Sequence, residues 1–238
     1  MGLSEQTTVK ELFLRSCKKN DVSAARYFLS LGADVNWKGV WAGLHWAARD
    51  NFRELLELLL TQTGVDVNIT NDCQQTPLML ACSNGHENIV RRLIRMPDIQ
   101  YHIKDVYGKA ALHWAVLENK PRSVEVLRGV GASVDWNVRS SYGDYPLTLA
   151  VHYGYPAILQ TILSVPELDL SVMDQDGRDV AQIAVEGNMG DRQRVVEILS
   201  KDRRVNWNIR NSDGDTPLMY CLKNNKIEMA QGQSQSCG

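Results

Sequence analysis

The residues of this chain that could do chemistry are five histidines and five cysteines. Their spacing in the sequence indicates whether they could bind a metal or have structural roles. Zinc sites and disulfide frameworks both need clustered or evenly paired ligands. The cysteines are scattered and odd in number, at Cys17, Cys73, Cys82, Cys221 and Cys237. Neither His102 nor His152 has a carboxylate or cysteine at ligand spacing. We therefore expect no metal site and reduced cysteines, as in a cytoplasmic protein, with the nucleus as a further location.

Motifs for catalysis or cofactor binding are missing from the sequence. It contains no glycine-rich phosphate loop, no His-Glu-x-x-His and no Gly-x-Ser-x-Gly. The glycine pairs at 39 and 43 and at 129 and 131 are interpreted as turns. We expect no catalytic residue, no cofactor and no enzymatic activity.

The charge balance limits the classes of partner. Lys and Arg number 26 against 28 Asp and Glu, which gives a net charge of -2. Such a chain does not hold nucleic acid or an anionic membrane by bulk electrostatics. One uncharged segment, residues 145–166, contains three prolines, so we expect two short helices there and no membrane span.

A repeat of about 34 residues determines which elements carry these side chains. Equivalent positions fall at residues 42, 76, 110, 145, 179 and 216, in steps of 34, 34, 35, 34 and 37. In the best-defined unit Thr76 stands at an N-cap and Pro77 at the first helical position. A short helix, a turn at Gly85 and a second helix with apolar residues at helical spacing follow. An extended stretch with a glycine turn then leads to the next unit.

These features resemble the ankyrin repeat. The matching residues are the Thr-Pro-Leu start at Thr76, the Gly85-His86 turn and the hairpin sequence Gly-Ala-Asp-Val-Asn at 32–36. The tetratricopeptide repeat shares the period but lacks the capped Thr-Pro start and the hairpin. The resemblance covers about residues 5 to 230. It implies an all-α repeat solenoid of about six to seven stacked units, each a helix-turn-helix with a hairpin finger.

The expected domain is residues 1–230, and the polar tail at 231–238 is predicted to be disordered. The units are expected at about 5–36, 37–68, 69–102, 103–137, 138–171, 172–208 and an incomplete 209–230. The first unit, from Leu12 to Leu31, is interpreted as an N-terminal cap. In the last unit only Ile227 and Met229 remain as anchors for a second helix, so we expect fraying from about Lys223 onward.

Two histidines and two tryptophans near the start of the first helices are expected to have structural roles. The resemblance implies that His45 and His113 form hydrogen bonds within their own units. Trp46 and Trp114, one residue further on, are expected in the core.

The resemblance implies a protein–protein interaction module that binds on its concave surface, built from finger tips and first helices. The aromatic and charged residues projected onto it form the binding strip: Trp41, Arg49, Tyr107, Lys109, Tyr142, Asp144, His152 and Tyr153. Aromatic and Arg side chains are enriched in binding hot spots. We expect a monomer that binds another protein. The alternatives are an ankyrin segment that regulates a larger polypeptide, and a sensor of a nucleotide-like ligand on the same strip.

Asn68 is a candidate modification site. A Leu at position 60 lies eight residues before this Asn, which directly follows Asp66-Val67. The string resembles sites of the oxygen-dependent asparaginyl hydroxylase on ankyrin hairpins. The alternative is that Asn68 simply forms hydrogen bonds across its own turn. Asn36 is a weaker candidate because Phe28 occupies the Leu position.

Overall fold

The computed structural model describes residues 3–226, and these residues form thirteen α-helices and no β-strand. The helices are α1 (Leu3–Lys18), α2 (Val22–Ser30), α3 (Gly43–Arg49), α4 (Arg53–Leu60), α5 (Pro77–Asn84), α6 (Glu87–Leu93), α7 (Ala111–Leu117), α8 (Pro121–Arg128), α9 (Pro146–His152), α10 (Pro156–Leu163), α11 (Val180–Glu186), α12 (Arg192–Ser200) and α13 (Pro217–Lys223).

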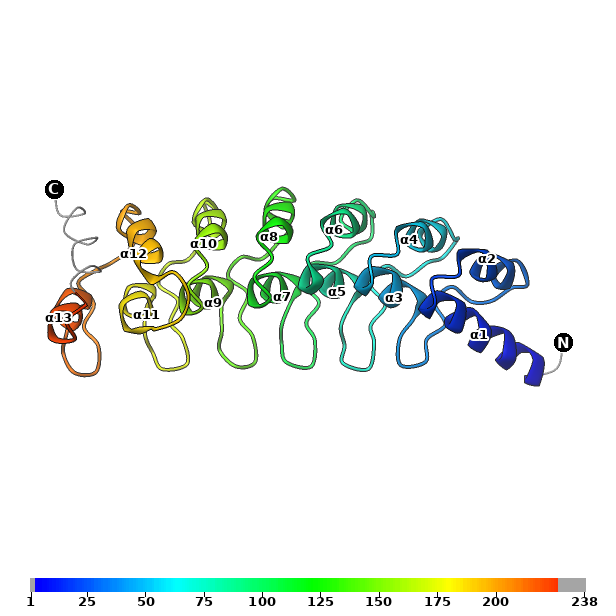
Figure 1. Cartoon of the computed structure of the whole chain (residues 1–238), viewed down its shortest axis with the longest axis horizontal. Coiled ribbons are helices and arrows are strands. Elements are labelled where there is room, and N and C mark those ends of the chain that lie inside the picture. Colours follow the sequence, from blue (N-terminus) through cyan, green and yellow to red (C-terminus); the bar gives the residue numbers. More distant parts are fainter. Residues whose placement is uncertain (1–2, 227–238) are drawn as a thin grey trace.

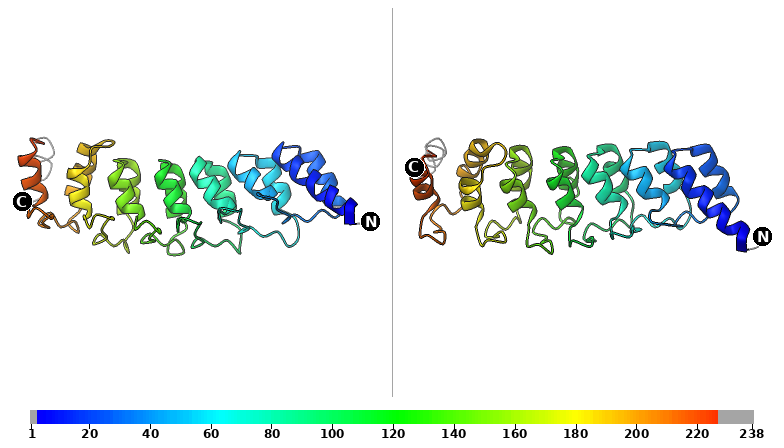
Figure 2. Two further views of the ribbon diagram at one scale, coloured as in Figure 1. Left: turned by 90° about the horizontal axis from the view of Figure 1, so that it is seen from below. Right: turned by 60° about the horizontal axis from the view of Figure 1, so that its bottom comes forward.

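The helices stand in pairs along an elongated body (Figure 1). The first helices of successive units pack in series, from α1 through α3, α5, α7, α9 and α11 to α13. The second helices form a parallel row, and the long loop between one pair and the next hangs from the opposite edge (Figures 1 and 2). We call each of these loops a finger. The all-α repeat solenoid predicted from the sequence is confirmed.

Local sequence explains where the first helices begin. The side chains of Thr76, Asp179 and Thr216 each accept a hydrogen bond from the backbone N–H three residues later. Each satisfies one of the N–H groups that a helix leaves free at its N-terminus. Pro77 and Pro217 follow two of these caps at the first helical position, where a missing N–H costs nothing.

The turn between the two helices of a unit needs a residue in the left-handed region. Asn20, Asn51, Gly85 and Asn119 have φ values from 50° to 72° at this position. Asparagine and glycine tolerate this conformation better than other residues. The turns predicted at Gly85 and Gly154 are therefore confirmed.

The sixth unit replaces this turn with a longer loop, residues 187–191. The loop approaches the turn of the preceding unit so closely that a Cβ on Gly154 would lie 2.5 Å from the carbonyl oxygen of Met189. The N–H of Asp191 donates to the carbonyl of Gly154 at 3.2 Å. The backbone of the inserted loop thus contacts the neighbouring unit, while the side chain of Met189 stays 45% exposed.

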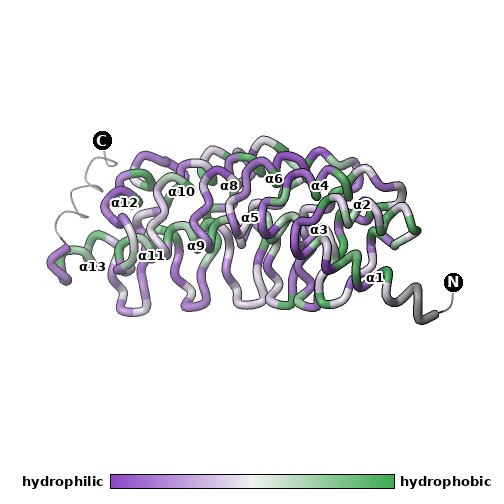
Figure 3. The backbone as a smooth tube through the Cα atoms, turned by 45° about the vertical axis from the view of Figure 1, so that its right-hand side comes forward, coloured by the Kyte–Doolittle hydropathy of each residue, from purple (hydrophilic) through white to green (hydrophobic). Residues whose placement is uncertain are grey.

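Small residues allow the helix layers to approach closely. Ala47, Ala81, Ala115, Ala150 and Ala184 are completely buried on successive first helices. Larger aliphatic side chains from the second helices complete one core that continues from unit to unit. In Figure 3 the finger loops beneath α9, α11 and α13 are mostly hydrophilic, as expected for segments outside this core.

The uncharged segment at 145–166 forms two short helices, α9 and α10, as predicted. Among the described residues, no helix is both long and apolar enough to cross a membrane. At the N-terminal end, α1 starts at Leu3, well before the predicted Leu12, and residues 18–21 are exposed as expected of a cap. The tail at 231–238 and most of the segment that was expected to fray from about Lys223 onward lie outside the described residues.

Candidate functional site

The N-terminal part of the binding strip is a cluster of two tryptophans and one arginine. Trp41 lies on the finger that precedes α3, and its ring centre is 4.9 Å from that of Trp46. The guanidinium of Arg49, one turn further along α3, lies 4.9 Å from Trp41 and 4.5 Å from Trp46. Arg49 also forms two 2.7 Å hydrogen bonds with Asp50. Its charge is therefore already balanced within the molecule.

The expectation that Trp46 and Trp114 are core residues is wrong. Both are only half-buried and lie at the edge of the core. The position after His45 or His113 turns toward the finger: Trp46 lies against Trp41, and Trp114 donates to Asp105. A cation lies over each of the two rings. The two tryptophans therefore belong to the candidate site, which the sequence alone did not indicate.

The central part of the strip is a group of aromatic rings around Lys109. Tyr107 and Tyr142, from neighbouring fingers, stack with ring centres 6.1 Å apart. The Nζ atom of Lys109 lies 5.0 Å from the ring centre of Tyr142, 5.5 Å from Tyr107 and 5.7 Å from Trp114. This geometry is that of cation–π contacts, which hold the ammonium group without neutralising its charge.

A buried carboxylate, Asp105, fixes this arrangement. Its Oδ1 accepts hydrogen bonds of 2.9 Å from the backbone N–H groups of Tyr107 and Lys109. Its Oδ2 accepts the indole N–H of Trp114, also at 2.9 Å. One side chain thus holds the finger tip and the first helix together. Sequence reasoning missed Asp105, although an Asp four residues before Lys109 at a glycine turn is typical of such a bond.

Hydrogen bonds also join the fingers of units three, four and five. The N–H of Val106 donates to the carbonyl of Cys73 at 3.1 Å, and the N–H of Ser141 donates to that of Tyr107 at 3.0 Å. The three central fingers therefore form one connected ledge, and we use central ledge for residues 71–75, 105–109 and 140–144.

The remaining strip residues line a hollow beside the ledge. His152 and Tyr153 end α9, with ring centres 5.0 Å apart, and Tyr153 stacks on Tyr155 at 5.7 Å. The hollow has a volume of about 310 Å³. Its wall includes five charged side chains: Lys109, Asp144, Asp174, Asp176 and Arg178. The structure thus brings Lys109, Asp144, His152 and Tyr153 together as one surface.

His45 and His113 have hydrogen-bond partners on both ring nitrogens. In His45, Nδ1 accepts the N–H of Ala42 at 3.1 Å, so Nε2 carries the proton and donates to the carbonyl of Gln75 at 3.0 Å. His113 repeats the pattern with Ala110 and Asp144. Burial lowers the pKa of each histidine to about 4, which keeps both neutral. The bond within the unit was expected, whereas the bond to the next unit was not.

Asn68 joins two fingers. Its side-chain amide donates to the carbonyl of Asp98 at 2.7 Å, and its Oδ1 accepts the N–H of Gln100 at 2.9 Å. The same pair of bonds occurs at Asn36 and Asn137. The partner of Asn68 thus lies on the following finger and not only in its own turn. Its modification stays a prediction.

Comparison with known proteins agrees with this geometry. A family model of ankyrin repeats in three copies matches residues 44–140 and 147–232. The chain belongs to the ankyrin-repeat family. Its fold is similar to that of a solved ankyrin repeat domain from Acinetobacter baumannii, with a TM-score of 0.71 and 20% identity over 81% of this chain and 96% of the other.

Two of the proteins that are similar in sequence are longer than this chain. The chain is 30% identical over 193 residues to the target of rapamycin complex 2 subunit AVO2 of Saccharomyces cerevisiae, covering 78% of this chain and 44% of AVO2. It is 35% identical over 89 residues to the E3 ubiquitin-protein ligase XBAT33 of Arabidopsis thaliana, covering 37% of this chain and 17% of XBAT33. The chain therefore spans less than half the length of either relative. Ankyrin repeats generally mediate protein–protein interaction, and the repeat fold itself is typically non-enzymatic.

Proposed function

We propose that this chain is a non-catalytic interaction module that binds a protein partner on the binding strip. The observation that carries the proposal is the pair Tyr107 and Tyr142, which are 44% and 50% exposed although they stack on each other. Their rings lie on finger tips outside the core. Packing within the chain therefore does not account for two large aromatic side chains here.

Lys109 adds a charge that is available to a partner. Within the described part of the chain its Nζ has no ion pair, while the neighbouring Arg178 is paired with Asp174 and Asp176. A carboxylate or carbonyl group of the partner would bind this ammonium between the two tyrosine rings. Exposed aromatic residues around one polar anchor are typical of binding hot spots.

Site-specific cross-linking tests this proposal. A photoreactive phenylalanine analogue is placed at Tyr107, Tyr142 or, as a matched control, at Tyr27, an exposed tyrosine on α2. We expect the two ledge positions to cross-link to the same protein in cells, and position 27 not to. Equal yields of that adduct at all three positions would contradict the proposal.

The identified partner then permits a quantitative measurement. Replacing Tyr107, Tyr142 and Tyr153 together by Ala should weaken binding by more than about 2 kcal/mol, because hot-spot aromatics dominate interface energies. The Tyr27→Ala variant should bind normally. Unchanged affinity in the triple variant, with normal circular dichroism, would show that the partner binds to another surface.

There are two alternatives to this proposal. The first is that the module acts as the ankyrin segment of a larger protein, as its similarity to parts of longer relatives suggests. The second is a nucleotide-like ligand on the strip. The acidic lining of the hollow at Asp144, Asp174 and Asp176 disfavours an anionic ligand, as does the pairing of Arg49 with Asp50. A thermal-shift screen with nucleotides tests the second alternative, and fluorescent tagging tests the expected cytoplasmic or nuclear location.

A further inference from the structure

A second hollow lies on the second-helix side of the solenoid, between units four and five. It has a volume of about 550 Å³, and its walls are the loops that follow α8 and α10, two neighbours in the row of second helices (Figure 1). We call it the loop pocket. Val134, Trp136 and Val165 line it and are each only 6% exposed, so part of its wall is apolar. It shares no residue with the central ledge or with the hollow beside the ledge.

Small residues in the loop after α8 explain why this space is open. Residues 131–133 are Gly, Ala and Ser, and a Cβ on Gly131 would meet no atom within 4 Å. The loop is also long. Val134 is the sixth residue after the last residue of α8, whereas Leu168, its counterpart, is the fifth after the last residue of α10. The wall thus gains one residue without gaining a large side chain at 131–133.

The equivalent gap between units five and six is bridged by an arginine of the chain itself. Arg204 lies in the loop after α12, and its Nη2 donates to the carbonyl of Leu163 at 2.7 Å. Its Nη1 donates to the carbonyl of Val165 at 3.4 Å. Leu163 is the last residue of α10, so the guanidinium meets the negative end of this helix. A planar cation with several N–H donors therefore suits a gap of this kind.

The loop pocket lacks this arginine. Glu167 holds in unit five the position that Arg204 holds in unit six, two residues before an Asp or Asn. The end of α8 corresponds to the end of α10, since the N–H of Val130 and that of Val165 each donate to the carbonyl three residues earlier. A carboxylate cannot donate to carbonyl oxygens. The negative end of α8 is therefore left without a cation from the following unit.

The charged side chains of the loop pocket are mainly acidic. Asp135 and Glu167 lie in its wall, and neither forms an ion pair within the described part of the chain. Arg128 is the one cation among the described residues that line it. Two carboxylates and a helix C-terminus against one cation give the pocket a negative potential. An incoming cation is therefore favoured over an anion.

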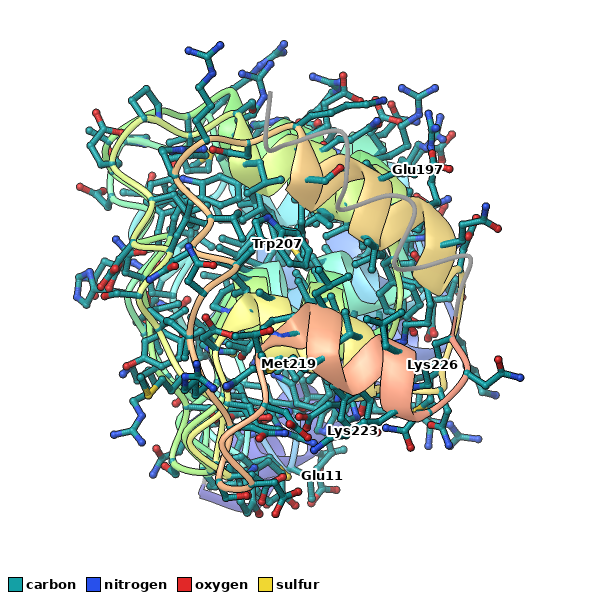
Figure 4. All side chains as sticks on the ribbon, turned by 90° about the vertical axis from the view of Figure 1, so that its left-hand side faces the viewer. Glu11, Glu197, Trp207, Met219, Lys223 and Lys226 are labelled. Atoms are coloured by element: carbon teal, nitrogen blue, oxygen red, sulfur yellow. The ribbon has the colours of Figure 1, made fainter. Side chains whose placement is uncertain are left out.

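Trp136 adds a hydrogen-bond donor to this site. Although the residue is almost fully buried, its indole N–H has no partner among the described residues. Figure 4 labels Trp207, the equivalent residue of unit six, which is seen between α12 and α13. The indole N–H of Trp207 is also unpaired in residues 3–226 although Arg204 is present, because a guanidinium offers no acceptor. An occupant that satisfies Trp136 must therefore bring a carbonyl group as well as a cation.

We propose that the loop pocket binds an arginine side chain on an extended segment of a partner protein. The guanidinium lies against the carbonyls at the end of α8, as Arg204 does one unit later, with Glu167 beside it. The methylene groups cover Val134 and Val165, and a backbone carbonyl of the segment accepts the indole N–H of Trp136. Arginine suits this site better than lysine, because its planar fork donates to several carbonyls at once. The interaction goes beyond the proposed function, because it uses neither the central ledge nor the hollow beside it.

Nuclear magnetic resonance titration of the full chain tests the inference. The probe is the blocked tripeptide acetyl-Ala-Arg-Ala-methylamide, and the matched control has citrulline, a neutral isostere, in place of arginine. We expect the arginine peptide to shift the indole N–H resonance of Trp136 and not that of Trp207, with saturation in the millimolar range expected for a single side chain. The citrulline peptide should bind at least fivefold more weakly. No shift at Trp136, or equal binding of the two peptides, would overturn the inference.

Substitutions at two exposed positions test the role of charge. Glu167→Gln should weaken binding of the arginine peptide by about threefold, the size of an exposed charge pair, and Arg128→Gln should strengthen it. Glu167→Arg copies unit six, so its side chain should fill the loop pocket and abolish the shift at Trp136, with normal circular dichroism. Peptide binding that Glu167→Arg leaves intact would overturn the inference. The Tyr107→Ala/Tyr142→Ala variant should bind the peptide normally, so failure of the proposed function and failure of this inference give different results.

Discussion

Nη1 of Arg192, at the start of α12, donates a hydrogen bond of 2.5 Å to the carbonyl oxygen of Val151 near the end of α9. The same guanidinium donates to the carbonyls of His152 and Ile183. In the described part of the chain no carboxylate pairs with this buried arginine. Burial lowers its pKa to about 10, which leaves it charged at neutral pH. The negative ends of α9 and α11 stabilise the charge in place of an acid.

Replacing Arg192 by Ala should lower the free energy of unfolding by about 2 kcal/mol, because carbonyls of two helices lose a buried donor. Arg194→Ala is the control, since Arg194 forms an exposed pair with Glu197 and should contribute under about 0.5 kcal/mol. Urea unfolding followed by circular dichroism measures both. Equal stabilities of the two variants would mean that the carbonyls rehydrate without cost.

Acid should destabilise the chain through His45 and His113. Their folded pKa of about 4 lies below the ordinary value of 6.5, so between these limits the unfolded state binds more protons. The stability contributed by each neutral histidine is present above pH 6.5 and is lost as the pH falls toward 4, by roughly 3 kcal/mol at most.

The histidine variants separate this effect from the titration of carboxylates. His45→Gln and His113→Gln copy the sixth unit, where Gln182 accepts the N–H of Asp179 at 3.1 Å. The double variant should show a shallower loss of stability between pH 6.5 and pH 4. A slope unchanged from that of the original chain would assign the acid sensitivity to other groups.

Asn68→Ala should cost about 1 kcal/mol, because it removes both hydrogen bonds to the following finger. The matched control is Asn208→Ala at the equivalent position of the sixth unit, where the side chain has no hydrogen bond to another described residue. Thermal unfolding compares the two. A control as destabilised as Asn68→Ala would argue that asparagine acts here through its turn conformation.

Hydroxylation of Asn68 is a separate prediction. The hydroxylase requires an extended target strand, so the two bonds to Asp98 and Gln100 must break first. We expect a mass increase of one oxygen atom on the peptide containing Asn68 after co-expression with the enzyme. A peptide without this addition would show that the sequence at residues 60–68 is that of an ordinary repeat and not that of a hydroxylase site.

The fold was predictable because each unit carries its own local signals. Thr76 and Pro77 mark a helix start, and Gly85 marks the turn, without reference to other units. Contacts between units were not predictable in this way. His45 was expected to bond within its unit and does so through Nδ1, but its Nε2 bond to Gln75 depends on the stacking distance.

The site was predictable only in part. Tyr107 and Tyr142 lie on finger tips as projected, since glycine turns locate the tips in the sequence. Trp114 was assigned to the core because the repeat pattern does not distinguish a position that faces the core from the position next to it in the sequence. Arg192 gave no signal, since nothing in its neighbourhood indicates that an arginine folds inward to reach another unit.

The backbone bonds that join Cys73 to Val106 and Tyr107 to Ser141 have a consequence for the thermodynamics of recognition. Surface loops usually lose conformational entropy when a partner immobilises them. In the central ledge that ordering has already taken place during folding. Association then restricts chiefly the partner and a few side-chain rotamers. A partner that is itself rigid would therefore dock as one body on another, with little adjustment of either backbone.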